Sequence, residues 1–272
     1  MVSSMRAFLR RPVATAALAL AASTASLPAT GSGQSSRPVL VAFAHPDDER
    51  VVGPLLSRLG REGREVHLVI ATDGSKGVRD HAGVPAGSPL ASARAKEAAC
   101  AARRLGVRQL HLLGLEDGAL ASFASLGRLR TEIANIITRL QPAAVITFGP
   151  EGGTGHPDHR MVGNVVTQVI QSDDWHRTVS LLYASLPTER LRTAPPSSPT
   201  VNGVAEDLLT VRVPFEDQDL LAGREAFACH RTQYTAAEMD AINNTLAHVW
   251  NGVVYLRPWH GTVRDPAAAL RP

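Results

Sequence analysis

The sequence predicts an α/β protein: a single Rossmann-like three-layer domain with a mostly parallel sheet and helices on both faces. From Pro38 onward, short runs rich in β-branched residues alternate with longer segments whose apolar residues recur at helical spacing. This alternation is typical of a parallel sheet covered by helices, and 272 residues suffice for one such domain. We expect the domain to span residues 37–266 and residues 267–272 to form a C-terminal tail.

The elements follow from these runs in chain order. Strands are expected at Val39–Phe43, Val66–Thr72, Leu110–Leu113, Ala143–Phe148, Ser180–Ala184, Leu208–Val213 and Val253–Leu256. Helices are expected at Asp48–Glu62, Pro89–Leu105, Ser125–Leu140, Pro157–Gln171, Phe215–Thr232 and Ala236–Val249. The stretch Leu186–Asn202 holds four prolines, and we expect it to be an irregular surface segment. In an open parallel sheet, ligands bind beyond the carboxyl ends of the strands, so the functional residues are expected there.

Residues 1–36 resemble a secretory signal peptide followed by a flexible leader. Arg6, Arg10 and Arg11 precede the apolar run Val13–Ala22, and a Gly/Ser-rich segment follows. The apolar run is about half of the ~20 residues that a membrane-spanning helix needs. We therefore expect an exported protein, periplasmic or extracellular, without a stable membrane anchor after processing.

The charge of the chain belongs largely to this leader. The net charge is +3, and removing the leader's three arginines leaves 25 basic and 25 acidic residues. A nucleic-acid-binding domain would keep a basic stripe after processing, and none is visible, so nucleic acid is not an expected partner.

The two cysteines, Cys100 and Cys229, could form one disulfide in an oxidising compartment. Cys100 lies in an Ala-rich helical pattern, however, where a buried thiol packs equally well. We expect free thiols, and neither cysteine shows the paired spacing of a zinc site.

The first chemical motif is Ala44-His45-Pro46-Asp47-Asp48-Glu49, placed directly after the first strand. Asp47 or Asp48 could cap the following helix. A capping role does not explain a histidine and three acids within five residues, so the motif favours a functional site.

The second motif is Gly149 to His159, which ends in Gly-His-Pro-Asp-His and follows the strand ending at Phe148. Pro157 suits the first position of a helix, which places His156 at its cap and His159 about one turn later. Together the two motifs supply three imidazoles and several carboxylates at strand ends that we expect to be neighbours. Such a set suits a catalytic zinc with an open position for water, and Fe²⁺, Co²⁺ and Ni²⁺ remain alternatives.

At these residues the chain resembles the PIG-L or LmbE-like family of zinc-dependent N-acetylglucosaminyl-deacetylases, over most of Pro38 to about Gln233. The resemblance implies that His45, Asp48 and His159 bind the metal.

The same resemblance implies the catalytic roles. Asp47 corresponds to the general base, and His156 to the residue that stabilises the oxyanion or protonates the leaving amine. Asp158 would hold the His156 imidazole in the right tautomer. These roles suit amide hydrolysis, because a metal lowers the pKa of bound water and polarises the carbonyl.

Weaker similarities point to the substrate pocket. Arg94 and Asp117 match family positions that contact the sugar, although a surface ion pair with Glu97 and an ordinary turn explain them equally well. Asp73 is a weaker candidate. His230 and Gln233 resemble a helix-end motif of the family, for which we expect a packing or supporting role.

Three hypotheses follow. The first is an exported, metal-dependent hydrolase that removes an acyl group, foremost acetyl, from an amino sugar or glycoconjugate. The second is a metal-containing carbohydrate-binding protein without turnover, which would need neither Asp47 nor His156. The third is a nucleotide-binding domain, but the glycine-rich loop lacks the Gly-x-Gly-x-x-Gly order and a P-loop lysine.

Overall fold

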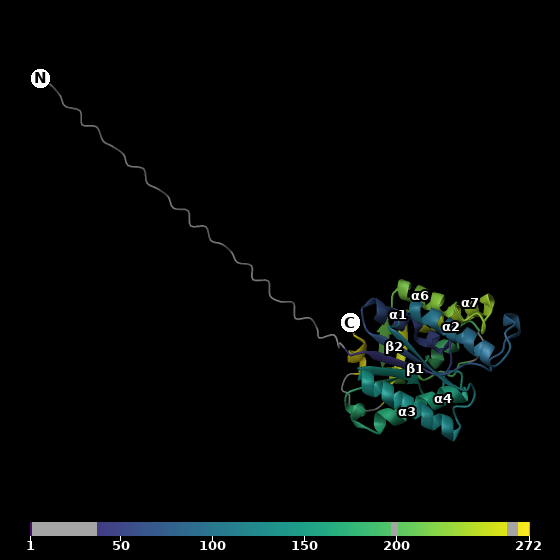
Figure 1. Cartoon of the computed structure of the whole chain (residues 1–272). Coiled ribbons are helices and arrows are strands. Elements are labelled where there is room, and N and C mark those ends of the chain that lie inside the picture. Colours follow the sequence, from purple (N-terminus) through teal and green to yellow (C-terminus); the bar gives the residue numbers. More distant parts are fainter. Residues whose placement is uncertain (2–36, 197–200, 260–265, 272) are drawn as a thin grey trace. The chain divides into compact units, whose positions relative to one another are not determined.

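The computed structural model describes residues 1, 37–196, 201–259 and 266–271 (Figure 1). Within these ranges seven strands form one sheet in the order β3-β2-β1-β4-β5-β7-β6. The strands are β1 Val39–Phe43, β2 Val66–Thr72, β3 Gln109–Leu115, β4 Ala144–Phe148, β5 Ser180–Ala184, β6 Val211–Pro214 and β7 Val253–Pro258. Strands β1 to β5 run parallel to one another, and β7 runs antiparallel to β5 and β6. The predicted mostly parallel sheet is confirmed.

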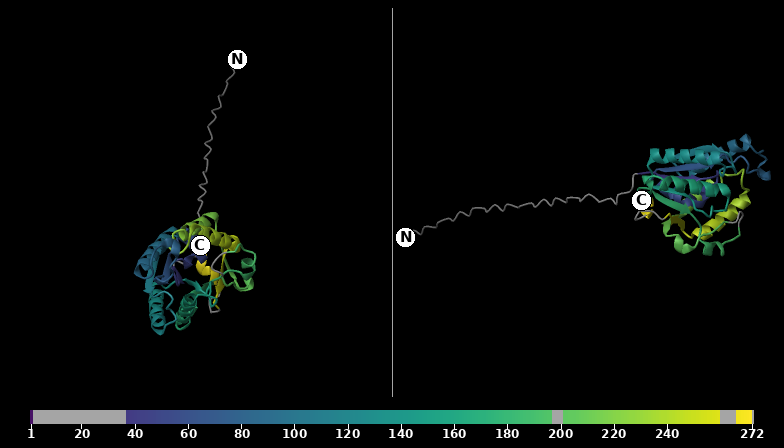
Figure 2. Two further views of the ribbon diagram at one scale, coloured as in Figure 1. Left: turned by 90° about the vertical axis from the view of Figure 1, so that its right-hand side faces the viewer. Right: turned by 90° about the horizontal axis from the view of Figure 1, so that it is seen from below.

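Helices cover both faces of the sheet. They are α1 Gly53–Arg61, α2 Ser88–Arg104, α3 Phe123–Leu140, α4 Pro157–Gln171, α5 Thr188–Leu191, α6 Asp217–Phe227 and α7 Ala236–Trp250. Short 3₁₀ helices lie at Asp48–Val52, Asp80–Ala82, Asp174–Arg177, Glu206–Leu208 and Pro266–Leu270. Helices α3 and α4 lie on the face opposite α1, α2, α6 and α7, as Figure 1 and the left view of Figure 2 show.

The central strand β1 explains why the two layers form. Val39, Val41 and Phe43 point into the core shared with α1 and α6, whereas Leu40 and Ala42 point into the core shared with α3 and α4. All five are fully buried. Alternate residues of a strand face opposite sides of the sheet, so a strand that is apolar at every position must be covered on both sides.

Most predicted elements are confirmed within a few residues, and three differ for physical reasons. The helix expected from Asp48 begins as a 3₁₀ turn, because Asp47 before it has a left-handed backbone with φ 117°. The helix expected from Phe215 to Thr232 ends at Phe227, where the chain turns toward α2. Strand β3 is longer than expected, because its pairing with β2 extends from Gln109 to Leu115; its mixed pattern of buried and exposed residues did not indicate these ends.

The expected tail at 267–272 includes most of the 3₁₀ helix Pro266–Leu270, and Leu270 is buried in the core. The leader expected at residues 1–36 lies outside the described residues apart from Met1. In the described part of the chain, every helix is too short or too polar to cross a membrane.

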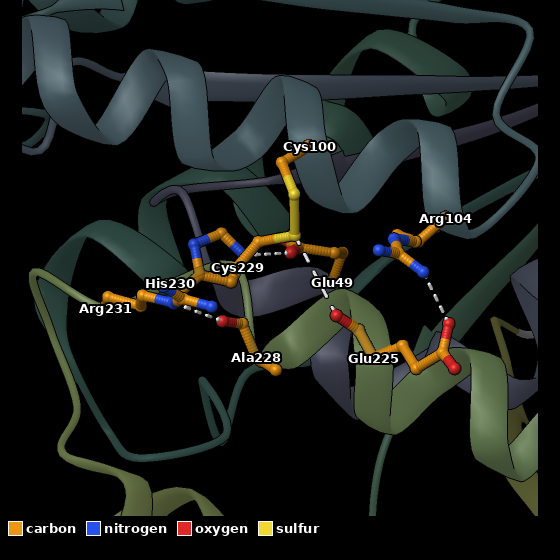
Figure 3. Close-up of a disulfide and its surroundings, with 8 residues drawn as sticks. All are labelled: Glu49, Cys100, Arg104, Glu225, Ala228, Cys229, His230 and Arg231. Carbon is orange, nitrogen blue, oxygen red and sulfur yellow. Dashed lines mark hydrogen bonds and ion pairs between the residues drawn. A yellow bond between two sulfur atoms is a disulfide. The ribbon is translucent and has the colours of Figure 1, made fainter.

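The two cysteines form a disulfide, so the expectation of free thiols is wrong (Figure 3). Cys100 lies on α2 and Cys229 lies just after α6, and these helices pack against each other. Their Cα atoms are 6.0 Å apart, within the range that a disulfide spans without backbone movement. The Ala-rich surroundings of Cys100 indicated packing, but they did not show which segment packs there.

The sheet order places β1 and β4 side by side at its centre. From β1 the chain continues to β2 on one side, and from β4 it continues to β5 on the other. This reversal is the position where open α/β sheets form a crevice at the carboxyl ends of their strands. Both chemical motifs follow directly from these two strands.

Candidate metal centre and active site

The loop after β1 is held in a tight turn around the carboxylate of Asp48. The backbone N–H of His45 donates to Asp48 Oδ2 at 2.8 Å, and that of Ala44 donates to the same oxygen at 3.2 Å. Within the turn, Asp47 adopts its left-handed conformation, which costs a non-glycine residue about 1–3 kcal/mol and is typical of functional sites. The backbone N–H of Asp47 donates to Glu49 Oε2 at 3.0 Å, which fixes the turn.

The second motif enters from α4, which packs closely against the end of β4. Gly163 on α4 has no room for a side chain, because a Cβ there would clash with the carbonyl oxygen of Phe148. This close approach brings the first turn of α4 to the crevice. There the His159 ring stacks on Phe148 with ring centroids 4.3 Å apart.

Three side chains predicted as metal ligands converge on one point. His45 Nδ1 lies 3.0 Å from His159 Nε2 and 3.6 Å from Asp48 Oδ2, and His159 Nε2 lies 3.1 Å from Asp48 Oδ1. Three ligand atoms around one tetrahedral zinc, at bonds of about 2.0–2.2 Å, lie about 3.3–3.6 Å from one another. The distances involve both oxygens of Asp48 and two are slightly shorter than this range, so the three side chains are close to the spacing that a single ion would need. His156 also has a ring nitrogen within 4.8 Å of ligand atoms of His45 and His159.

The protonation of the two histidines supports this fit. His159 Nδ1 lies 2.9 Å from the carbonyl oxygen of Gly152, so that nitrogen carries the proton and Nε2 carries the lone pair. His45 Nε2 lies 3.2 Å from Asp117 Oδ1 and 3.3 Å from Asp158 Oδ2, so its Nδ1 carries the lone pair. In these tautomers two lone pairs and a carboxylate face one another, an arrangement that suits a cation between them. Outer hydrogen bonds of this kind orient histidine ligands in metal sites.

The pKa shifts show how strongly this pocket favours positive charge. Burial lowers the pKa of His45, but its hydrogen bonds to Asp117, Asp158 and Asp48 outweigh burial and raise the pKa well above its ordinary value. Burial raises the pKa of Asp48, but the charges and hydrogen bonds of His159 and His45 outweigh it and hold the pKa well below its ordinary value. The carboxylates around His45 therefore favour a positive charge at this point.

The carboxylate of Asp47 is held by three donors. Tyr234 donates its hydroxyl to Oδ2 at 2.6 Å, Arg50 Nη1 donates to the same oxygen at 3.1 Å, and Arg94 Nη2 donates to Oδ1 at 3.2 Å. Burial raises the pKa of Tyr234, and the negative charge of Asp47 raises it further, so the phenol remains a donor. The position of this carboxylate is thus fixed beside the centre.

Side chains of the segment from Cys229 to Tyr234 contact the loop that carries Asp47 and Glu49. His230 Nε2 lies 2.5 Å from Glu49 Oε1, and both side chains are almost fully buried. Figure 3 shows this pair beside the disulfide. Because Glu49 also accepts from the backbone of Asp47, the expected supporting role of His230 has a physical basis.

A polar cavity opens over the centre. Its volume is about 330 Å³, measured as the space open to the centre of a water molecule. Seven of the predicted site residues line it: His45, Asp47, Asp48, Arg94, Asp117, His156 and His159. The structure thus brings together both metal-binding motifs and both candidate substrate residues.

The two candidate substrate residues are tied into this site. Arg94 is buried and also donates to the carbonyl oxygen of Pro46 at 2.6 Å. Burial raises the pKa of Asp117, but the hydrogen bond and charge of His45 outweigh it, with help from the Lys76 backbone and Arg94, and lower the pKa to about 2. The weaker candidate Asp73 does not line the cavity; its Oδ1 accepts from the backbone of Ser75 and Asp117 and supports their loops.

The position of Asp158 differs from the expectation. Its carboxylate accepts from the backbone of Gly118 at 2.8 Å and Leu120 at 3.1 Å and faces His45. Among the described residues it forms no hydrogen bond with His156. Instead the backbone N–H of Asp158 donates to His156 Nδ1 at 3.1 Å, because His156 caps α4. The tautomer of His156, with its proton on Nε2, is therefore set by the helix cap.

Sequence reasoning missed Tyr234 and Arg50, which both contact Asp47 and line the cavity. Tyr234 directly follows the His230-x-x-Gln233 motif, which was the available signal. Gln233 itself lines the cavity and donates to the carbonyl oxygen of Gly77 at 2.8 Å. Nothing in the sequence around Arg50 separated it from a surface arginine.

A parallel sheet with a buried His/Asp cluster at the carboxyl ends of its central strands defines an α/β enzyme whose centre can hold a metal ion. Residues 40–170 match the family described as PIG-L: GlcNAc-PI de-N-acetylase. The chain is therefore similar to this family over about half of its length.

Relatives and solved structures agree with this assignment. A 1D-myo-inositol 2-acetamido-2-deoxy-alpha-D-glucopyranoside deacetylase from Catenulispora acidiphila is 27% identical over 271 residues, covering 82% of this chain and 89% of that protein. A probable N-acetyl-alpha-D-glucosaminyl L-malate deacetylase from Bacillus cereus is 34% identical, covering 49% of this chain and 61% of that protein. The structure of N,N'-diacetylchitobiose deacetylase from Pyrococcus horikoshii has a TM-score of 0.64 at 22% identity, covering 83% and 84%. The structural likeness establishes the shared fold.

Proposed function

We propose that this protein is a metal-dependent N-deacylase that hydrolyses N-acyl amides, N-acetyl among them, on an amino sugar or glycoconjugate. The observation that carries the proposal is the convergence of His45, Asp48 and His159 at the floor of a polar cavity, with the Asp47 carboxylate beside them. The similarity to this family and the activities for which the relatives are named support the same reaction.

The donor set favours zinc as the native metal. Two imidazole nitrogens and one carboxylate are a common ligand set of catalytic zinc sites, which keep a further position open. When bound, such a metal lowers the pKa of water and polarises an amide carbonyl.

The residues of the chain then divide the proton transfers. Asp47 accepts a proton from the attacking water, and the three hydrogen bonds on its carboxylate hold it in place for this step. Water oxygen bonds to the carbonyl carbon, the C–N bond breaks, and the products are a carboxylate and an amine. His156 is partly exposed at the cavity, and its Nε2–H can donate to the developing oxyanion or to the leaving nitrogen.

Arg94 and Asp117 are proposed to bind hydroxyl groups of the sugar at the polar cavity. A carboxylate whose pKa is about 2 stays ionised and accepts hydrogen bonds from hydroxyls across the working pH range. A binding protein without turnover would not need the three hydrogen bonds that hold Asp47, so we do not favour that alternative.

Export is part of the proposal. Disulfides persist mainly in oxidising compartments, so the Cys100–Cys229 bridge agrees with the secretory leader expected at residues 1–36.

The direct test is acetate release from N-acetylglucosamine conjugates by the purified protein, with metal content measured on the same sample. Asp47→Asn should retain the metal and lose at least about 100-fold in kcat, because the proton acceptor is removed. The matched control is Asp240→Asn, which changes an exposed aspartate on α7 and should leave kcat unchanged. The proposal would be refuted if zinc-loaded wild-type protein released no acyl group from any amide tested. It would also be refuted if Asp47→Asn released acyl groups as fast as the wild type.

A further inference from the structure

A second cavity borders the centre, and it differs in character from the polar one. It shares four lining residues with the polar cavity: Asp48, Arg50, Thr154 and His159. The two cavities therefore border the same candidate metal ligands.

The walls of the second cavity are apolar. They are formed mainly by Phe148, Leu186, Leu191, Val201, Ile242 and Leu246. These residues come from β4, from the segment after β5 and from α7, so most of them lie outside residues 40–170, which match the family. Specificity carried by this cavity would therefore belong to the C-terminal half of the chain.

The one further polar side chain in the apolar walls is turned away from the space. The hydroxyl of Thr245 lies 2.9 Å from the carbonyl oxygen of Pro195 and 3.0 Å from that of Ala241, so its hydrogen-bonding capacity is used by the backbone. Apart from Thr245 and the four shared residues, the described side chains of the lining are apolar, and apolar cavities bind apolar groups in preference to water.

An amide has two sides, and the two cavities match them. The amine side of an amino sugar carries hydroxyls and needs a polar, open cavity with charged groups. The acyl side carries only hydrocarbon and needs an apolar space next to the carbonyl carbon. We propose that the apolar cavity is an acyl-binding site and that the preferred substrate carries an acyl chain of three to five carbons, longer than acetyl. This inference rests on the proposed deacylase function and names the acyl group that it removes.

The size of the cavity sets the chain length. It offers about 40 Å³ to the centre of a water molecule. A single water needs about 10–15 Å³ on this measure, so the cavity has room for about three waters or a similar number of carbon atoms. A chain of that length fills the space, whereas a longer chain would have to displace Ile242 or Leu246.

The test is a series of N-acyl glucosamines from acetyl to octanoyl, with kcat/KM measured for each on the zinc-loaded protein. Each methylene that enters the cavity should raise kcat/KM about fourfold, so the butanoyl substrate should exceed acetyl by about 15-fold. The values should fall again beyond pentanoyl. A decline from acetyl onward would overturn the acyl-site proposal and leave the deacylase function intact, whereas no hydrolysis of any member would overturn both.

Two substitutions at one wall residue separate chain length from general damage. Leu246→Phe should narrow the cavity and lower the butanoyl-to-acetyl ratio of kcat/KM to about one. Leu246→Ala should widen it and move the optimum toward longer chains. Leu221→Phe is the matched control, because Leu221 on α6 is 58% exposed and should leave the profile unchanged. If both Leu246 variants keep the wild-type ratios, the acyl chain does not enter this cavity and the proposal fails.

Discussion

The disulfide gives a stability prediction that can be worked from its position. Replacing Cys100 and Cys229 by serine opens a bridge between residues 129 positions apart. A loop of that length corresponds to about 5 kcal/mol of lost chain entropy in the unfolded state, and measured values for disulfides are typically 2–4 kcal/mol. We therefore expect the double variant to lose between about 2 and 5 kcal/mol.

Thermal unfolding measures this loss. For a domain of this size, each kcal/mol lowers Tm by about 2–4 °C, so the double variant should unfold about 4–20 °C below the oxidised protein. The wild-type protein treated with reductant should unfold near the double variant. The matched control is Arg104→Gln, which removes the exposed ion pair with Glu225 beside the disulfide. Exposed pairs contribute between about 0 and 1 kcal/mol, so this control should shift Tm by little.

If oxidised protein, reduced protein and the double variant share one Tm, the bridge does not restrict the unfolded chain. Two thiols titrating in the purified native protein, without reductant, would show that the bridge is not formed at all.

Three further predictions concern the centre and the core. Tyr234→Phe should lower kcat by about 10- to 100-fold with little change in KM, because it removes a hydrogen bond to the charged Asp47. If Tyr234→Phe lowered kcat by the same factor in a protein that already carries Asp47→Asn, this role would be contradicted. His159→Ala should reduce bound metal to less than one tenth of the wild-type content while circular dichroism keeps the native fold, and full metal content would rule out the ligand role. Asp219→Asn should lower the free energy of unfolding at pH 7, because it removes the charge of a buried carboxylate that accepts hydrogen bonds from the exposed side chain of Arg61. Burial raises the pKa of Asp219, but the hydrogen bonds from Arg61 outweigh burial and lower the pKa. The stabilisation by Asp219 is therefore fully present above about pH 4 and is lost as the pH falls through the lowered pKa. Chemical denaturation should show the stabilities of the two proteins converging in that range.

The sequence predicted the central sheet well, because strands buried on both faces have little freedom in composition. Strands β1, β2 and β5 have the expected bounds, and helix α4 begins at Pro157 as expected. Here the local pattern and the tertiary environment demand the same residues, so the pattern was sufficient.

The segment after α6 was not predictable in this way. The helical pattern continues past Phe227, but His230 leaves the helix to contact Glu49, and Tyr234 reaches Asp47. These contacts join residues more than 180 positions apart, and no local pattern encodes them. The disulfide of Cys229 was missed for the same reason, since its partner lies on another helix.

At the site, the sequence predicted the side chains that converge, and it did not predict most of the side chains that hold them. His45 and His159 lie in short motifs, so their grouping was visible in the sequence. The carboxylate of Asp158 turns toward His45 because the backbone of Gly118 and Leu120 holds it there. Such second contacts depend on loop geometry, which the sequence did not specify.

The pairing of β1 with β4 has a thermodynamic consequence. The two histidines that face each other at 3.0 Å are 114 residues apart in the chain, and they meet only when these strands are neighbours. An unfolded chain holds no such site, so an ion binds the native state alone and each tenfold rise in its free concentration above the dissociation constant adds about 1.4 kcal/mol to the free energy of unfolding. Chelators should consequently behave as mild denaturants of this protein, and the dissociation constant of the ion can be read from the dependence of Tm on its concentration.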